Sequence, residues 1–171
     1  MGKSRKEIAI EHFKEGYGCA QSVFVTFADV CGIERDTALR LASSLGGGMG
    51  RMREVCGTVS AMALVAGMMT GSTKPKDIEA KKHTYDIVQK LAKEFREQHG
   101  SIVCKELLGL VKQNKDGICA ASFQDTTPEK RTEEYYKKRP CVELVGCAAE
   151  ILEKNFLSKE EREDENKNEN E

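Results

Sequence analysis

The sequence predicts an all-α fold, a single-domain bundle of roughly seven or eight helices followed by a disordered acidic tail. Apolar residues repeatedly fall three and four positions apart, whereas the period-two alternation that is typical of strands is almost absent. A chain of 171 residues normally forms one domain. The segment 158–171 holds seven acidic and three basic residues, a composition that favours solvation over packing. We therefore expect a helical domain over residues 1–157 and a disordered charged tail over 158–171.

Capping residues and glycines delimit the helices in the first part of the chain. Serine and aspartate favour helix starts because their side chains accept hydrogen bonds from unpaired N–H groups, and glycine favours helix ends. We expect a first helix from about Ser4 to Gly16, a second from about Gly18 to Val30, and a third that begins at the cap Asp36 and ends at the glycines 46–48.

The fourth helix, expected over about 55–69, lies in a stretch without charge between Glu54 and Lys74. This stretch raises the question of a membrane span, which needs about twenty predominantly apolar residues. Glycine, serine and threonine interrupt it at eight positions. We therefore expect no membrane span, and instead a helix of small residues at the centre of the bundle, packed on several sides.

Proline and capping residues delimit the helices in the second part of the chain. Proline is tolerated in the first turn of a helix, where its missing N–H would be unpaired in any case. Regular periodicity is lost over 112–127, which predicts a loop. We expect a long fifth helix from Pro75 and Asp77 to Gly100, a sixth capped by Ser101, a short charged seventh over about 129–138, and a last helix from Pro140 and Cys141 to about Phe156.

The chain contains seven cysteines, and four of them fall where the even-numbered helices are expected to begin. These helix-start cysteines are Cys19, Cys56, Cys104 and Cys141. Short connections favour antiparallel neighbours, so alternate helices are expected to begin at the same end of the bundle and to bring the four thiols together there. A thiol at a helix start faces unpaired N–H groups that favour its thiolate form. The pattern therefore predicts a redox or metal site.

Two chemistries remain open for such a site. The helix-start cysteines are expected to hold an iron–sulfur cluster, with zinc or no metal as the alternatives. No two cysteines form the close pair that is typical of zinc and iron–sulfur motifs, so the site depends on the folded bundle. The other chemistry is a disulfide between helix starts. Cys141 and Cys147 lie in one helix at roughly 9 Å along its axis, too far apart for a bridge that needs Cα atoms within about 7 Å.

The glycine-rich segment 46–50 precedes a helix but matches neither common phosphate-binding motif. We expect these glycines to let the backbone pass close to the sulfur site, because glycine has no side chain to exclude it. Arg51 or Arg53, which follow, are expected to offset thiolate charge.

The compartment follows from the N-terminus and the cysteines. The polar N-terminal residues lead directly into an amphipathic segment without an apolar signal peptide, so we expect a reducing cytoplasm, where permanent disulfides are rare. Cys31, Cys119 and Cys147 do not share the helix-start setting, and we expect them to be inert apolar side chains.

The overall composition argues against nucleic-acid binding. The net charge is −1, tryptophan is absent, and no basic stripe is interleaved with aromatic residues. We expect the partner to be an electron-transfer protein instead, and the chain could also form a homodimer.

The sequence resembles a known family at several separate points. The matching segments are Gly18-Cys19-Ala20-Gln21-Ser22-Val23, the glycine loop 46–51, Cys56-Gly57, Cys104 and Cys141. Together they resemble the redox-active family called C_GCAxxG_C_C over about residues 16–156. The resemblance implies that its four defining cysteines correspond to the helix-start cysteines, and it implies a redox or cluster-binding role. The Cys-Gly-Ala-x-x-Gly stretch of the family departs here at Thr58 and Ala61, both still small.

The sequence therefore leaves three functions open. The first is a redox protein that binds an iron–sulfur cluster or another metal for electron transfer. The second is a thiol–disulfide redox protein that uses the same cysteines without metal. The third is a helical interaction protein whose thiols are incidental.

Overall fold

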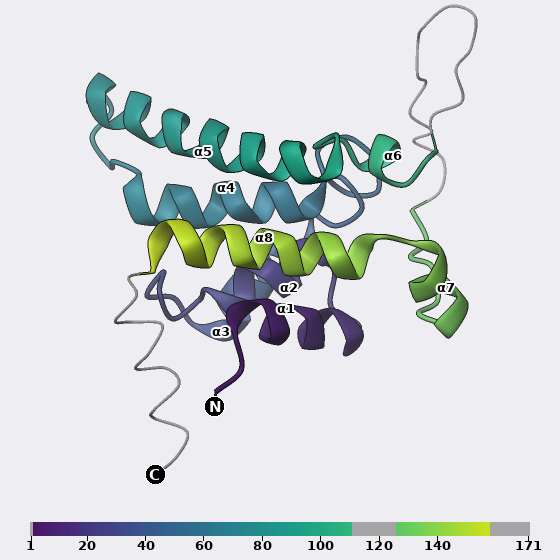
Figure 1. Cartoon of the computed structure of the whole chain (residues 1–171). Helices are drawn as coiled ribbons and strands as arrows, with labels where there is room; N and C mark the ends of the chain where they lie inside the picture. The colour runs from purple at the N-terminus through teal and green to yellow at the C-terminus, as the bar shows by residue number, and fades with distance from the viewer. Residues whose placement is uncertain (1, 111–125, 158–171) are drawn as a thin grey trace, which may run out of the picture.

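A computed structural model describes residues 2–110 and 126–157, and within these residues the chain is all-helical, as predicted (Figure 1). The described helices are α1 (Arg5–Lys14), α2 (Cys19–Thr26), α3 (Arg35–Ser43), α4 (Gly57–Thr70), α5 (Ile78–His99), α6 (Cys104–Leu107), α7 (Glu133–Lys138) and α8 (Cys141–Phe156). The expected tail over 158–171 and Cys119 lie outside the described residues.

Local hydrogen bonds explain where several helices begin and end. The Ser4 hydroxyl accepts from the N–H of Glu7 at 3.2 Å, and the Glu7 carboxylate accepts from the N–H of Ser4 at 2.8 Å, a capping box at the start of α1. Asp77 caps α5 by accepting from the N–H of Ala80 at 3.0 Å. Gly100 ends α5 in a left-handed conformation with φ 82°. These three boundaries agree with the sequence prediction.

Four other boundaries differ from the prediction. The cap of α3 is Glu34, so Asp36 lies in the first turn and helps through its charge rather than as a cap. The α6 cap is Val103, because the Ser101 hydroxyl accepts from the N–H of Val103, two residues along, and not from an N–H in the first turn of the helix. Thr132 caps α7, which therefore starts later than expected. The second helix ends at Thr26, since its C-cap Phe27 leaves the helical region at φ −114°.

The helix α4 lies at the centre of the bundle, as its uniformly uncharged sequence predicted. It packs against α2, α5 and α8, and Figure 1 shows α5, α4 and α8 stacked as three long ribbons. Helix α1 packs against α8 at Gly146. A Cβ atom added to Gly146 would lie only 2.9 Å from the Cδ1 atom of Ile10 in α1, so glycine permits this close contact. In the described part of the chain no helix is both long and apolar enough to cross a membrane.

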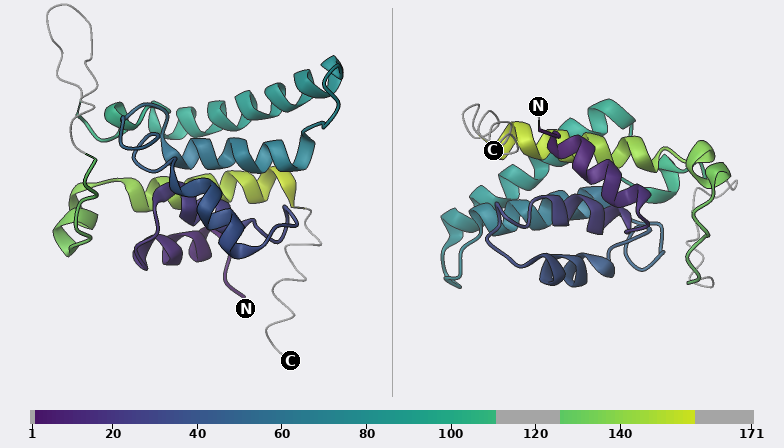
Figure 2. Two further views of the ribbon diagram at one scale, coloured as in Figure 1. Left: turned by 180° about the vertical axis from the view of Figure 1, so that it is seen from behind. Right: turned by 90° about the horizontal axis from the view of Figure 1, so that it is seen from below.

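The packing brings several helix starts to one end of the bundle. In Figure 1, α4 and α8 both begin at the right-hand end, where α5 finishes and α6 lies. The two views of Figure 2 show the same arrangement from behind and from below. Antiparallel packing of neighbouring helices therefore separates an end rich in helix starts from the opposite end, where α4 passes into α5.

A buried arginine fixes α1 to the end of α2. The Arg5 side chain is 7% exposed, and its guanidinium donates to both carboxylate oxygens of Asp29, at 2.9 and 2.7 Å, and to the carbonyl of Thr26. A buried guanidinium is tolerated only when its N–H groups are paired. The pair therefore stabilises the contact between these two helices.

We expect Arg5→Leu to lower the free energy of unfolding by about 2 kcal/mol, because charged hydrogen bonds are lost while Asp29 is exposed enough to regain water. Urea unfolding at pH 7 measures this change. The matched control is Lys6→Leu on the same helix, whose ion pair with Glu150 is half-exposed and contributes about 0.5 kcal/mol or less. An Arg5→Leu variant no less stable than the control would contradict the role of this pair.

Candidate functional site

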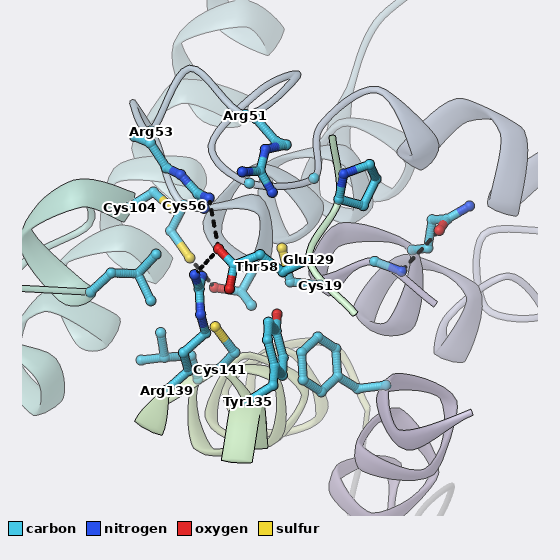
Figure 3. A pocket seen from close by; sticks show the side chains of 18 of the residues that line it. Cys19, Arg51, Arg53, Cys56, Thr58, Cys104, Glu129, Tyr135, Arg139 and Cys141 are labelled. Atoms are coloured by element: carbon cyan, nitrogen blue, oxygen red, sulfur yellow. Dashed lines mark hydrogen bonds and ion pairs between the residues drawn. The ribbon is translucent and has the colours of Figure 1, made fainter. Parts of the chain in front are cut away.

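The structure places each helix-start cysteine at the beginning of a helix. Cys19, Cys104 and Cys141 are the first residues of α2, α6 and α8, and Cys56 is the N-cap of α4. All four line one cavity of about 730 Å³, and Figure 3 shows their side chains around it. The geometric expectation that alternate helix starts bring these cysteines to one place is confirmed. Their chemical role is a separate question.

A short backbone pairing joins the starts of α4 and α6. Val55 and Val103 form an isolated antiparallel bridge. Beside it, the N–H of Cys56 donates to the carbonyl of Ile102 at 2.8 Å, and the N–H of Cys104 donates to the carbonyl of Glu54 at 2.6 Å. These bonds place Cys56 opposite Ile102 and Cys104 opposite Glu54, so that the two cysteines flank the Val55–Val103 bridge on its two sides. No period-two pattern announces this pairing, so the sequence analysis missed it.

Cys19 reaches the site because α4 begins with a glycine. A Cβ atom added to Gly57 would lie 2.6 Å from the Cys19 Sγ atom and 2.9 Å from the carbonyl oxygen of Leu45. Real Cβ atoms do not approach other atoms so closely, so only glycine fits here. The Cys19 thiol therefore packs against the first residue of α4, directly after Cys56.

The glycine loop is a left-handed turn. The five residues 47–51 all have positive φ, between 53° and 75°, and Arg53 follows at 62°. Met49, Arg51 and Arg53 are not glycines, and each such left-handed residue costs about 1 kcal/mol or more of backbone strain. Gly48 also passes within reach of α6, since an added Cβ would lie 2.8 Å from the Cβ of Cys104. The loop thus brings backbone close to the thiols, as expected, and carries Arg51 and Arg53 to the cavity.

The cavity is strongly basic. Its charged lining consists of Arg51, Arg53, Arg131, Arg139 and Glu129, an excess of three positive charges. The Arg53 Nη1 atom lies 3.8 Å from the Cys104 Sγ atom, which agrees with the expectation that this arginine offsets sulfur charge. Arg131, Arg139 and Glu129 were not foreseen, because the short charged helix expected over about 129–138 gave no sign that it would reach the thiols. The one available signal was the position of Arg139 two residues before Cys141.

The thiols are not activated in the way the helix-start argument predicted. Burial and the neighbouring Cys19 raise the pKa of Cys56, and burial and Cys19 raise the pKa of Cys141 to about 11. Burial also raises the pKa of Cys104, although the hydrogen bond and charge of Arg53 oppose this change. For these three residues the prediction of a favoured thiolate is wrong, because removal from water outweighs the helix-end effect.

A hydroxyl group contacts the most buried of these thiols. The Thr58 Oγ1 atom lies 3.1 Å from the Cys56 Sγ atom, and Thr58 is fully buried in the first turn of α4. Thr58 is one of the two positions at which the chain departs from the family stretch that it resembles. Its hydroxyl adds a hydrogen bond to sulfur that an alanine would not provide, so the departure changes the surroundings of Cys56 without blocking it.

Cys31 and Cys147 do not belong to the cavity. Cys147 is buried in the middle of α8, where its thiol lies 3.3 Å from the Gln98 Oε1 atom, and Cys31 is half-buried against the core. The six described cysteines are all free thiols. Within residues 2–110 and 126–157, no three Cys, His, Asp or Glu side chains are grouped so that they could hold one metal ion.

Comparison with known families gives one match. The family model described as putative redox-active protein (C_GCAxxG_C_C) matches residues 17–155, a range that contains all four helix-start cysteines. No curated protein and no solved structure matches the chain.

We expect Gly57→Ala to lower the free energy of unfolding by about 1–3 kcal/mol, since its Cβ would overlap both the Cys19 thiol and a backbone carbonyl. Thermal unfolding of the reduced protein measures this. The matched control is Gly67→Ala in the same helix, where an added Cβ meets nothing within 4 Å and alanine should stabilise by about 0.5–1 kcal/mol. Equal effects of the two substitutions would contradict the close contact.

The raised pKa of Cys141 predicts a loss of stability at alkaline pH. Its pKa in the folded chain, about 11, exceeds the ordinary value of 9.0, so the folded state holds the proton more tightly. The resulting stabilisation is complete below pH 9 and is lost as the pH rises through 11. The unfolding free energy of reduced, metal-free protein should therefore fall more steeply over this range than that of Cys141→Ser. Parallel pH profiles for the two proteins would exclude a raised pKa.

Proposed function

Because the chain belongs to the C_GCAxxG_C_C family, we propose that it is a redox protein whose helix-start cysteines bind an iron–sulfur cluster for electron transfer with a partner protein. The observation that carries this proposal is the convergence of four thiols from four separate helices on one cavity. Incidental thiols have no reason to occupy four helix starts and to line the same space. An iron–sulfur cluster would fit this donor set, since four cysteine thiolates are the usual ligands of such clusters.

The geometry favours a cluster over a single ion. One tetrahedral ion with bonds of about 2.3 Å needs its four sulfur ligands roughly 4 Å apart. In the described residues no three donors are grouped in that way. In a polynuclear cluster the thiolates bind different irons and stand farther apart, and the cavity volume of about 730 Å³ leaves room for the additional atoms. We therefore propose the cluster in preference to zinc.

The surrounding charges suit an anionic group. Four thiolates would add negative charge to a space in which arginines outnumber acids by three. Arg53, which lies beside Cys104, and Arg139, which acts on both Cys104 and Cys141, stabilise the ionised sulfurs. The raised thiol pKa values apply to the chain without metal. A metal that binds the sulfur atoms displaces their protons, so raised pKa values do not prevent binding. The bound group supplies the one-electron chemistry.

The protein would set the properties of this group through hydrogen bonds and burial. Sulfur ligands at helix starts lie near unpaired N–H groups, and donors to sulfur raise the reduction potential of a cluster. Cys56 and Cys104 are buried, whereas Cys19 and Cys141 are partly exposed. The partly exposed side of the cavity is the side from which a partner protein would exchange electrons.

One observation favours a second candidate, a thiol–disulfide redox protein. The Cys19 Sγ atom packs against Gly57, next to Cys56, and Cys19 contributes to the raised pKa of Cys56. Oxidation of this pair would form one disulfide and release two protons and two electrons to a disulfide acceptor. The raised pKa of Cys56 slows such exchange, because the thiolate is the attacking form. This chemistry therefore ranks below the cluster.

Reconstitution with ferrous iron and sulfide under anaerobic conditions tests the proposal. We expect the full chain to bind iron and sulfide and to show visible absorption that is bleached by dithionite. Serine in place of any one helix-start cysteine should lower bound iron to less than half, because each thiolate is a ligand.

The chain offers matched controls for this experiment. Cys31→Ser and Cys147→Ser remove thiols that lie outside the cavity lining and should leave bound iron unchanged. Iron binding that is absent, or that is lost equally in the controls, would overturn the cluster. Loss of two thiol equivalents on oxidation, mapped to Cys19 and Cys56 in iron-free protein, would support the second candidate instead.

A further inference from the structure

We propose that Arg53 and Arg139 form a binding site for small carboxylates inside the thiol cavity, and that Glu129 of the same chain occupies this site when no ligand is bound. The proposal goes beyond the proposed cluster, since it concerns a small-molecule ligand held by the arginines. The geometry that carries it is a carboxylate shared by two guanidinium groups beside the helix-start cysteines.

The three charged groups come from separate segments. Arg53 follows the left-handed loop, Arg139 stands between α7 and α8, and Glu129 precedes α7. The Glu129 Oε1 atom contacts an Nη2 atom of Arg139 and lies 3.9 Å from the Arg53 Nη2 atom. In Figure 3 dashed lines join this carboxylate to both arginines in the middle of the labelled cysteines. The carboxylate therefore lies inside the same lining as the thiols.

The two arginines are more deeply buried than the glutamate. The side chains of Arg53 and Arg139 are each 17% exposed, and that of Glu129 is 46% exposed. Arg139 also lies over the Tyr135 ring at 5.0 Å, and Arg53 contacts Cys104. Glu129 lies in a stretch outside any helix, where residues 126–130 are exposed. Each arginine thus has a contact in the cavity besides Glu129.

Removal of Glu129 would leave the arginines without a counter-ion. Glu129 is the one acidic residue in the described lining of the cavity. Two largely buried cations close together are unfavourable unless an anion neutralises them. Guanidinium groups match the planar geometry of a carboxylate, so a ligand of this class replaces the interactions of Glu129 most directly.

The position of the site indicates what such a ligand would do. Arg53 contacts both the Glu129 carboxylate and the Cys104 sulfur, so a bound carboxylate lies one side chain away from a proposed cluster ligand. A small carboxylate-bearing molecule would therefore bind next to the proposed redox group. The presence of that group rests on the proposed function, whereas carboxylate binding itself does not.

If Glu129 competes with a ligand carboxylate for the two arginines, removal of Glu129 should raise the affinity of the protein for that ligand. A ligand that binds only when Glu129 has left has an apparent affinity reduced by the fraction of molecules in the open form. Acetate, which reproduces the terminal carboxylate of glutamate, is the simplest probe. Calorimetric titration of the full chain at constant ionic strength, adjusted with chloride, should show weak saturable binding to the natural protein.

We expect Glu129→Ala to bind acetate at least tenfold more tightly than the natural protein, and Glu129→Gln to change affinity in the same direction. Adding Arg139→Gln to Glu129→Ala should remove the gain. Glu133→Ala is the matched control, because Glu133 is an exposed acid on α7 that pairs with Lys137 away from the cavity lining. It should leave acetate affinity unchanged.

Iron content measured on the same samples separates this proposal from the cluster. Tighter acetate binding by both Glu129 variants, lost with Arg139→Gln, supports the carboxylate site whether or not iron binds. The proposal would be overturned if either folded Glu129 variant bound acetate with unchanged affinity. It would also be overturned if the gain in acetate affinity persisted after Arg139→Gln or appeared equally in Glu133→Ala. Circular dichroism confirms that each variant is folded before titration.

Discussion

The antiparallel pairing between Val55 and Val103 is the interaction on which the rest of the site depends. It ties the start of α4 to the start of α6 through two backbone hydrogen bonds whose donors are Cys56 and Cys104 themselves. With α4 fixed, Gly57 presents a bare backbone on which the Cys19 thiol packs, and α8 packs against both α4 and α2. The convergence of four thiols therefore follows from the placing of one central helix.

The electrostatics of the cavity follow from this packing. Burial favours neutral thiols, which is why the pKa values of the described cavity thiols are raised where a shift is resolved. The same enclosure strengthens the effect of nearby arginines on any negative charge that forms there. The protonated thiols are therefore the stable form in this site, and in the proposed cluster the arginines would offset the charge of the thiolates. Glu129 balances part of the arginine charge, and in our further proposal a ligand carboxylate would replace it.

Local rules in the sequence were sufficient for the helices and for the positions of the helix-start cysteines. Apolar periodicity, the Ser4 and Asp77 caps and the glycines located the main elements, and alternation of short-linked helices placed the thiols together. The burial of the thiols depends on tertiary packing and could not be predicted from the local sequence, so the predicted thiolate activation was wrong. The arginines and Glu129 near α7 were also missed, because their meeting depends on tertiary packing and leaves no periodic signal.

Iron K-edge X-ray absorption of the anaerobically reconstituted chain tests the central claim most directly. Four thiolates holding one cluster predict iron surrounded by sulfur alone at about 2.3 Å, together with a short iron–iron distance. Iron coordinated mainly by oxygen or nitrogen, or sulfur-coordinated iron with no iron neighbour, would contradict a cluster held by the helix-start cysteines.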